Sequence, residues 1–137
     1  MEIRRTICVI ACSKSKRNYA CPARLLYIGT AFKQSVKFAE SKGLKWFVLS
    51  AKYGIVQPET IIAPYEQTLQ ALSREQRDVW ITKVRKQLTE SYPRTNFIIL
   101  AGGMYKDPFK GMAITEPLKG LSQGKRIQRL KQLCEQS

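Results

Sequence analysis

Three short apolar runs constrain the fold of this chain more than any other feature of its sequence. They are Thr6–Ala11, Lys45–Ser50 and Asn96–Ala101, and each contains several β-branched or aromatic residues. Short, nearly continuous apolar runs of this kind are typical of strands that are buried on both faces of a sheet. We therefore expect three buried strands, with Ala113–Thr115 as a candidate for a fourth, shorter strand.

Three amphipathic segments predict helices. The first, Thr30–Lys42, ends at Gly43. The second begins after Ser73, which has Gln76 as its capping-box partner, and ends at Pro93. The apolar faces would be formed by Phe32, Val36 and Phe38 or Ala39 in the first helix, by Val79, Trp80, Val84 and Leu88 in the second, and by Ile127, Leu130 and Leu133 in a last helix that begins after Ser122.

The alternation of strands and helices predicts an α/β protein with a mostly parallel sheet that is covered by helices on both faces. At 137 residues the chain has about the size of one domain, which usually contains roughly 100–200 residues. A chain of this size can bury enough surface to fold without a metal ion or a disulfide. We expect a single domain over residues 1–137 with the architecture of a three-layer sandwich.

The charge balance favours a polyanionic partner. Lysine and arginine number 24, aspartate and glutamate number 10, the net charge is +14, and the sequence contains no histidine. The lack of histidine excludes Ser-His-Asp and Cys-His catalysis and histidine-dependent zinc sites. So large a positive charge most often indicates a nucleic-acid partner. A basic protein whose charge serves only its solubility is the alternative.

The four cysteines indicate neither a metal site nor a disulfide framework, because Cys8, Cys12, Cys21 and Cys134 include no CxxC pair. Cys8 and Cys134 fall in apolar or amphipathic segments and are expected to pack in the core. No run approaches the roughly 18 apolar residues of a membrane span, and the first residues lack the pattern of a secretory signal. We expect a cytoplasmic protein with no cofactor, no metal and no membrane partner.

Polar, glycine and aromatic residues follow each expected strand. Because ligands of open α/β sheets bind where the strands end, these residues are expected to converge on one site. The candidates are Cys12, Ser13, Lys14, Ser15 and Lys16 after the first strand; Ser50, Lys52, Tyr53, Tyr65, Glu66 and Thr68 after the second; Gly102, Gly103 and Tyr105 after the third; and Glu116 and Gly120 after the fourth.

The loop after the first strand has the chemistry of a phosphate site. Ser13, Lys14, Ser15 and Lys16 offer hydroxyl, ammonium and backbone N–H donors. The pair at 102–103 allows a positive φ and a close approach of the backbone to a ligand. A solvated basic turn and a plain strand-exit turn are the respective alternatives, and the GxxxxGK[ST] phosphate-loop pattern is absent.

Three tyrosines and one glutamate complete the candidate site. Tyr53, Tyr65 and Tyr105 could stack on a base, although each could instead be a half-buried packing residue. Glu66 is one of few acids outside the expected helices, so it could act as a general base or stabilise a cationic transition state. An ion pair with a lysine of these loops is its alternative role.

Four motifs occur in order along the chain. They are CSKSK after the first strand, PARLLYIGTAF leading into the first helix, WFVLSAKYGIVQP with IIAPYEQTL after the second strand, and PLKGLSQGKRIQRLK near the end. Together they resemble a family of small bacterial and phage proteins of uncharacterised function that are related to the peroxide-stress protein YaaA. The resemblance extends over nearly the whole chain.

A second set of positions carries a more distant likeness. These positions are Cys12, Ser13, Lys16, Ser50, Gly54, Pro58, Tyr65 and Glu66. They resemble motifs of the core domain of archaeosine synthase, which has a uracil-DNA-glycosylase-like fold and acts on a 7-deazaguanine base in tRNA. The resemblance implies that fold, with a nucleobase pocket at the strand ends. The chain departs from these relatives because no histidine follows CSKSK, Glu66 replaces an aspartate, and the GQDPY motif of uracil-DNA glycosylases is absent.

These observations lead to the hypothesis of an enzyme that processes a base within nucleic acid, with DNA favoured over RNA. It would cleave or exchange an N-glycosidic bond or alter a modified base, with Glu66, Ser13 and Lys16 as catalytic residues. The other candidates, apart from Glu116, would be binding residues. Taking a base out of the helix stack costs roughly a few kcal/mol, which favours single-stranded or damaged substrates. The alternative is a basic module that binds DNA, RNA or a nucleotide without chemistry.

Overall fold

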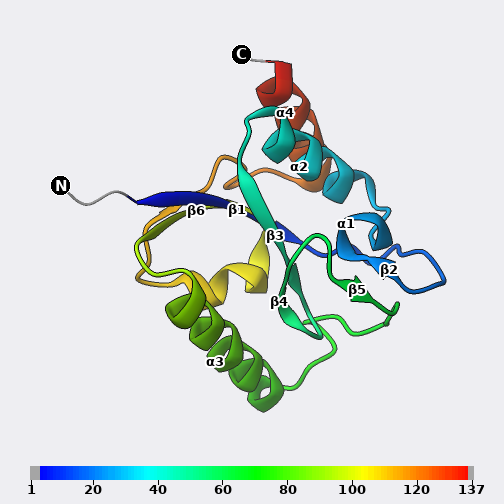
Figure 1. Ribbon diagram of the computed structural model, residues 1–137, viewed down its shortest axis with the longest axis vertical. Coiled ribbons are helices and arrows are strands. Elements are labelled where there is room, and N and C mark those ends of the chain that lie inside the picture. The colour runs from blue at the N-terminus through cyan, green and yellow to red at the C-terminus, as the bar shows by residue number, and fades with distance from the viewer. Residues whose placement is uncertain (1–3, 136–137) are drawn as a thin grey trace.

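The computed structural model describes residues 4–135, which form a mixed α/β fold around a five-stranded sheet (Figure 1). The strands are β1 (Arg5–Ala11), β3 (Lys45–Ser50), β4 (Gly54–Val56), β6 (Thr95–Leu100) and β7 (Ile114–Thr115). Their order is β4-β3-β1-β6-β7, and every pairing is parallel except that of β3 with β4. The prediction of a mostly parallel α/β sheet is confirmed.

Helices cover both faces of the sheet. They are α2 (Thr30–Ser41) and α4 (Gln123–Glu135) on one face, and α3 (Arg74–Ser91) with the 3-10 helix η1 (Gly103–Phe109) on the other (Figure 1). Side chains alternate between the two faces along a strand. In β1, Cys8 and Ile10 therefore enter the core beneath α2 and α4, whereas Ile7 and Val9 enter the core beneath α3.

A second, two-stranded sheet lies beside the main sheet, and no sequence pattern indicated it. It pairs β2 (Cys21–Pro22) with β5 (Ile61–Ile62) antiparallel, and α1 (Ala23–Leu26) follows β2 directly. The backbone nitrogen of Ala23 donates to the carbonyl oxygen of Thr60 at 2.9 Å. These elements are too short for a hydrophobic period to reveal them. They attach the segment before α2 to the segment before α3.

The start of α3 follows the predicted capping box. The Ser73 hydroxyl accepts a hydrogen bond from the Gln76 backbone at 3.1 Å, and the Gln76 side chain accepts one from the Ser73 backbone at 2.8 Å. The buried residues of the predicted apolar face are Trp80, Val84 and Leu88. The placement of Val79 on that face is wrong, because Val79 is 70% exposed. It lies roughly 100° around the helix from Trp80 and faces solvent.

No helix within residues 4–135 is long and apolar enough to cross a membrane. The same residues contain no group of three or more potential metal-ligating side chains. All four cysteines are free thiols. Cys8 is fully buried in the core, as predicted, and Cys134 packs against that core from α4.

Candidate functional site

A cavity of about 660 Å³ opens at the carboxyl ends of β1 and β6. Its lining comes mainly from the loop after β1, the first turn of α2, the segment after β6 and the first turns of α4. Ligands of open α/β sheets bind at this edge because loops and helix N-termini meet there. The cavity therefore lies where the strand ends predicted a site.

The cavity wall carries positive charge and no negative charge. Lys14 and Arg126 line it, and no aspartate or glutamate of residues 4–135 does. The starts of α2, at Thr30, and of α4, at Gln123, also form part of the wall. The N-cap residue of α2 is Gly29, and within the described part of the chain no side-chain cap bonds to the start of this helix. Unpaired N–H groups and the dipole at a helix start favour an anion, so the wall has the chemistry of an anion site.

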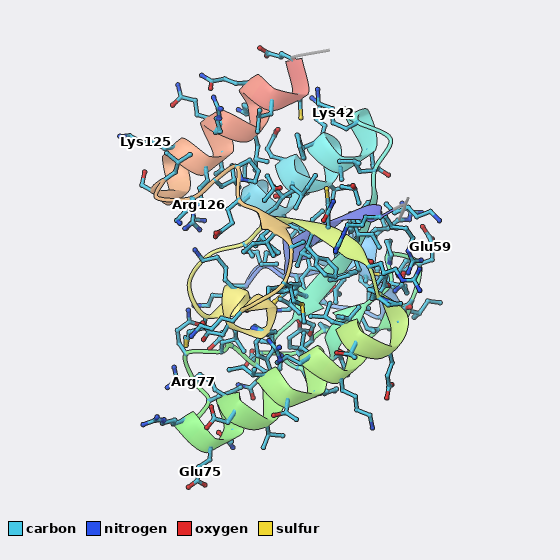
Figure 2. All side chains as sticks on the ribbon, turned by 90° about the vertical axis from the view of Figure 1, so that its left-hand side faces the viewer. Lys42, Glu59, Glu75, Arg77, Lys125 and Arg126 are labelled. Atoms are coloured by element: carbon cyan, nitrogen blue, oxygen red, sulfur yellow. The ribbon has the colours of Figure 1, made fainter. Side chains whose placement is uncertain are left out.

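Arg126 holds its guanidinium group against the backbone of the segment after β6. Its Nε donates to the carbonyl oxygen of Leu121 at 3.0 Å. A Cβ added to Gly102 would lie 2.5 Å from each of the two terminal nitrogens of Arg126, so the contact requires glycine at this position. No acceptor among residues 4–135 bonds to those two nitrogens. Figure 2 shows Arg126 at the start of α4. Its terminal nitrogens are therefore available to a ligand.

The loop after β1 packs against the start of α2. The Ser13 hydroxyl donates to the carbonyl oxygen of Ser15 at 2.7 Å and accepts from the backbone nitrogen of Gly29 at 3.3 Å. A Cβ on Gly29 would lie 2.8 Å from the Cβ of Ser13, so this close approach also requires glycine. Ser13, Lys14 and Ser15 all line the cavity. The structure thus brings this part of the predicted phosphate loop to the cavity.

Lys16 does not line the cavity. Its Nζ donates to the carbonyl oxygen of Lys14 at 3.2 Å and lies 4.4 Å from the centre of the Tyr65 ring. Burial lowers the pKa of Lys16, and the nearby Cys12 and Glu66 oppose that change. The lysine is held over an aromatic ring by a cation–π contact.

Ser50, Tyr65 and Tyr27 form a buried row of hydroxyl groups, which we call the tyrosine–serine chain. The Tyr65 hydroxyl oxygen lies 2.7 Å from Ser50 Oγ and 2.6 Å from the Tyr27 hydroxyl oxygen. Ser50 Oγ also accepts hydrogen bonds from the backbone nitrogens of Lys52 and Tyr53. Burial raises the pKa of Tyr27 to about 12 and also raises that of Tyr65. Both phenols are therefore neutral near pH 7. The tyrosine–serine chain fixes the turn after β3.

The tyrosine–serine chain removes several predicted binding residues from the cavity wall. Ser50 and Tyr65 are buried in the core and do not line the cavity. The Tyr53 ring packs edge-on against Tyr65 with 5.5 Å between ring centres, and Lys52 lies over the Tyr53 ring at 5.2 Å. Tyr65 is 9% exposed and Lys16 lies over its ring, so this ring is not open for stacking on a base.

Cys12 and Tyr105 meet in the cavity wall. The Cys12 sulfur lies 3.3 Å from the Tyr105 hydroxyl oxygen, and both residues line the cavity. The Tyr105 ring also packs edge-on against Trp80, with 6.0 Å between ring centres. Burial and, to a lesser extent, Cys12 raise the pKa of Tyr105, so its hydroxyl stays protonated. Among the three predicted tyrosines, Tyr105 is the one in the cavity lining.

The predicted carboxylates lie outside the cavity lining. Glu66 is exposed, follows Tyr65 directly and is close enough to Lys16 to influence the pKa of the lysine. Glu116 pairs with Lys106 at 3.0 Å and lines a separate hollow of about 260 Å³. Glu116 therefore does not line the cavity of about 660 Å³, although Gly103 lines both hollows.

Two of the remaining predicted residues have the contacts of turn residues. Thr68 Oγ1 accepts a hydrogen bond from the backbone nitrogen of Ala71 at 3.3 Å. Gly120 is exposed and has a φ of +77°, a conformation that favours glycine. Neither residue lines the cavity, whereas Gly102 and Gly103 both do.

Residues 7–132 match the profile of one protein family, described as "Family of unknown function (DUF6884)". The chain belongs to the DUF6884 family. The matched residues run from β1 into α4 and include the whole cavity lining. No curated protein matches the chain. Membership in DUF6884 therefore identifies the domain and leaves its activity open.

Sequence patterns did not single out Arg126 among the cations of the last helix of this DUF6884 domain. One signal marks Lys125 and Arg126 together, because both lie in the first turn of α4, where no acidic residue is present. The helix dipole disfavours cations at this end. A cation there is explained when an anion binds beside it. Gln70 and Gln123, which also line the cavity, carry no comparable signal in the sequence.

Proposed function

We propose that the protein binds one nucleotide unit of a nucleic acid in the cavity and processes its base. The reaction would be cleavage or exchange of the N-glycosidic bond, or a change to a modified base. The observation that carries this proposal is the acid-free cavity wall, which combines Arg126, Lys14 and the starts of α2 and α4. Phosphate is the biological anion that guanidinium and backbone N–H donors suit best.

The size and lining of the cavity support a nucleotide over a free phosphate ion. A volume of about 660 Å³ lies within the roughly 300–1,000 Å³ of typical ligand sites. Phe32, Leu118 and Tyr105 give the cavity an apolar and aromatic wall in addition to its cations. In this arrangement the phosphate lies at Arg126 and Lys14, and the base lies against the apolar wall.

The net charge supports a nucleic acid as the source of that nucleotide. A chain with a net charge of +14 attracts the phosphate backbone of either DNA or RNA. DNA is our first candidate, and the cytoplasm is the proposed location. Because flipping a base out of a duplex costs roughly a few kcal/mol, single-stranded or damaged strands are the favoured substrates.

The motifs of the chain support the same class of function. CSKSK and PYE resemble segments of YaaA-related proteins and, more distantly, of the core domain of archaeosine synthase. We propose on this basis that the fold is a three-layer sandwich of the uracil-DNA-glycosylase-like type. A five-stranded, mostly parallel sheet with helices on both faces is compatible with that architecture.

Glu66 is the carboxylate proposed for the chemical step. It would stabilise an oxocarbenium-like transition state or activate a water molecule. Glu66 is exposed beside Lys16, whose Nζ donates to the carbonyl oxygen of the cavity-lining Lys14. In this proposal the glycosidic bond of the bound nucleotide therefore lies at the edge of the cavity nearest Lys14. Ser13, held by Ser15 and Gly29, would orient the base or the water molecule.

The test is mass spectrometry of short single- and double-stranded oligonucleotides after incubation with the protein. The panel carries uracil, 5-hydroxymethyluracil, hypoxanthine and 7-deazaguanine. We expect loss or exchange of one base with the wild type, binding without turnover with Glu66→Gln, and binding weakened about tenfold with Arg126→Gln. Glu75→Gln, a substitution at an exposed position of α3, is the matched control and should behave as the wild type. Turnover by Glu66→Gln at the wild-type rate would contradict its catalytic role.

A non-catalytic nucleic-acid-binding module is the second candidate, and the position of Glu66 outside the acid-free cavity lining favours it. In that case every oligonucleotide keeps its mass, while the strands still bind with a steep dependence on salt concentration. Glu66→Gln would then bind slightly more tightly, because the substitution removes one negative charge. Affinity that does not depend on salt would contradict both candidates.

A further inference from the structure

Arg77 is a partly buried cation that has no oxygen acceptor among the described residues. It is the fourth residue of α3, its Nε is buried, and no group among residues 4–135 accepts a hydrogen bond from that nitrogen. One terminal nitrogen contacts the sulfur of Met104 at 2.7 Å, and a thioether sulfur is a weak acceptor. Buried polar groups in native proteins almost always have a partner. The position of Arg77 therefore has no explanation within the described fold.

Arg126 has the same position on the other face of the sheet. It is the fourth residue of α4, and its terminal nitrogens lie against Gly102. Gly102 and Met104 belong to the segment that follows β6, and both line the cavity. Figure 2 shows Arg77 and Arg126 on the same side of the molecule, each near the start of its helix. Two helices from opposite faces thus bring their arginines to one short segment of the cavity wall.

Both arginines are unfavourably placed within the described fold. A cation near a helix N-terminus opposes the helix dipole, and a partly buried guanidinium with an unpaired nitrogen loses hydration without compensation. The acids nearest to Arg77 along α3 are Glu75 and Asp78, which are exposed. Neither forms an ion pair with it within residues 4–135. Features that cost stability at the edge of a cavity are expected where a ligand uses them.

We infer that Arg77 is a second phosphate-binding residue of this site and that the ligand carries at least two phosphate groups. The inference rests on the proposed function, which places one phosphate at Arg126. Arg77 is not itself in the cavity lining and reaches the cavity through Met104. A methionine side chain is flexible, so it moves aside when a phosphate oxygen accepts from Arg77. A nucleic-acid strand, with its successive phosphates, engages both arginines, whereas a nucleoside monophosphate engages Arg126 alone.

The test compares three ligands by titration calorimetry at low salt: thymidine 5′-monophosphate, a 5′-phosphorylated thymidine dinucleotide and a short single-stranded oligothymidylate. The variants are Arg77→Met and Arg126→Met, which keep an unbranched chain and remove the charge. Lys83→Met, a substitution at an exposed position of the same helix as Arg77, controls for the loss of one positive charge. We expect Arg126→Met to weaken all three ligands about tenfold. Arg77→Met should weaken the dinucleotide and the oligonucleotide about tenfold and the monophosphate less than about twofold.

Thermal unfolding of the ligand-free variants separates binding from a structural role. Arg77→Met removes an unsatisfied buried nitrogen, so its Tm should equal or exceed that of the wild type. Arg77→Lys keeps the charge and should weaken the dinucleotide less than Arg77→Met does. A lower Tm together with unchanged dinucleotide affinity would overturn the inference, as would equal weakening of the monophosphate and the dinucleotide. Wild-type affinity of Arg126→Met for every ligand would instead overturn the proposed function and this inference with it.

Discussion

The sulfur of Cys12 lies 3.3 Å from the hydroxyl oxygen of Tyr105, a residue 93 positions further along the chain. The contact joins the end of β1 to η1 in the wall of the cavity. A ligand that fills the cavity therefore covers this thiol. Cys8, on the same strand, is fully buried, and burial raises its pKa to about 12.

These positions predict an order of cysteine reactivity, because the thiolate is the reactive form and must be accessible. In the native protein, iodoacetamide should modify Cys12 and the half-buried Cys134 well before Cys8 and Cys21, as peptide mass spectrometry can show. Saturating oligonucleotide should slow modification of Cys12 but not of Cys134, which lies on α4 outside the cavity lining. Protection of Cys134 to the same extent as Cys12 would contradict a ligand bound in the cavity.

The tyrosine–serine chain predicts a coupled loss of stability. Ser50→Ala leaves the backbone nitrogens of Lys52 and Tyr53 and the Tyr65 hydroxyl without their shared partner. We expect each of Ser50→Ala and Tyr65→Phe to lower the free energy of unfolding by about 1–3 kcal/mol. In urea denaturation the double variant should lose less than the sum of the two, because both changes remove the same hydrogen bond. Strict additivity would mean that the two hydroxyls do not interact.

The buried phenols predict a loss of stability in alkaline solution. Burial raises the pKa of Tyr27 from 10.0 to about 12, so the unfolded chain releases this proton at a lower pH than the folded chain. The contribution of this pKa shift to the free energy of unfolding is fully present below pH ~10 and is lost as the pH rises through about 12. Between about pH 9 and 11.5 the free energy of unfolding should decline in both proteins. The decline in Tyr27→Phe should be smaller than the decline in the wild type by up to about 2 kcal/mol. Tyr19→Phe, at an exposed position, should decline as the wild type does.

The close approach of Arg126 to Gly102 predicts that Gly102→Ala weakens binding without unfolding the protein. The φ of Gly102 is −132°, which alanine adopts readily, whereas the added Cβ would displace the flexible guanidinium group. We expect an unchanged Tm and reduced affinity for oligonucleotides in a fluorescence titration. Gly124→Ala is the control, because nothing lies within 4 Å of its added Cβ. It should stabilise α4 by up to about 1 kcal/mol and leave affinity unchanged, and equal weakening by both changes would refute the role of Arg126.

The two sides of α3 predict opposite responses to alanine. Leu88 is 1% exposed and Val79 is 70% exposed. Leu88→Ala should cost about 2–5 kcal/mol in the free energy of unfolding, because it leaves a cavity in the core. Val79→Ala should change stability by less than about 0.5 kcal/mol. A large loss with Val79→Ala would show that this residue is covered in solution.

Much of the fold followed from local patterns in the chain. The apolar runs at β1, β3 and β6 predicted three buried parallel strands, and the pairing of Ser73 with Gln76 predicted the start of α3. The two-stranded sheet and η1 were not predicted, because their elements are shorter than a hydrophobic period or are held by contacts with distant segments. Part of the candidate site also followed, since Cys12, Ser13, Lys14, Ser15, Gly102, Gly103 and Tyr105 all line the cavity.

Local composition was enough to predict the buried strands and the loops that follow them, because strand burial and parallel crossovers depend on short apolar runs and their spacing. Which side chains of those loops line the cavity depends instead on tertiary packing. Ser50 and Tyr65 enter the core because their hydroxyls satisfy one another, whereas Arg126 joins the wall because α4 begins beside Gly102. The direction of a side chain depends on the packing of distant elements, and no local pattern carries that information.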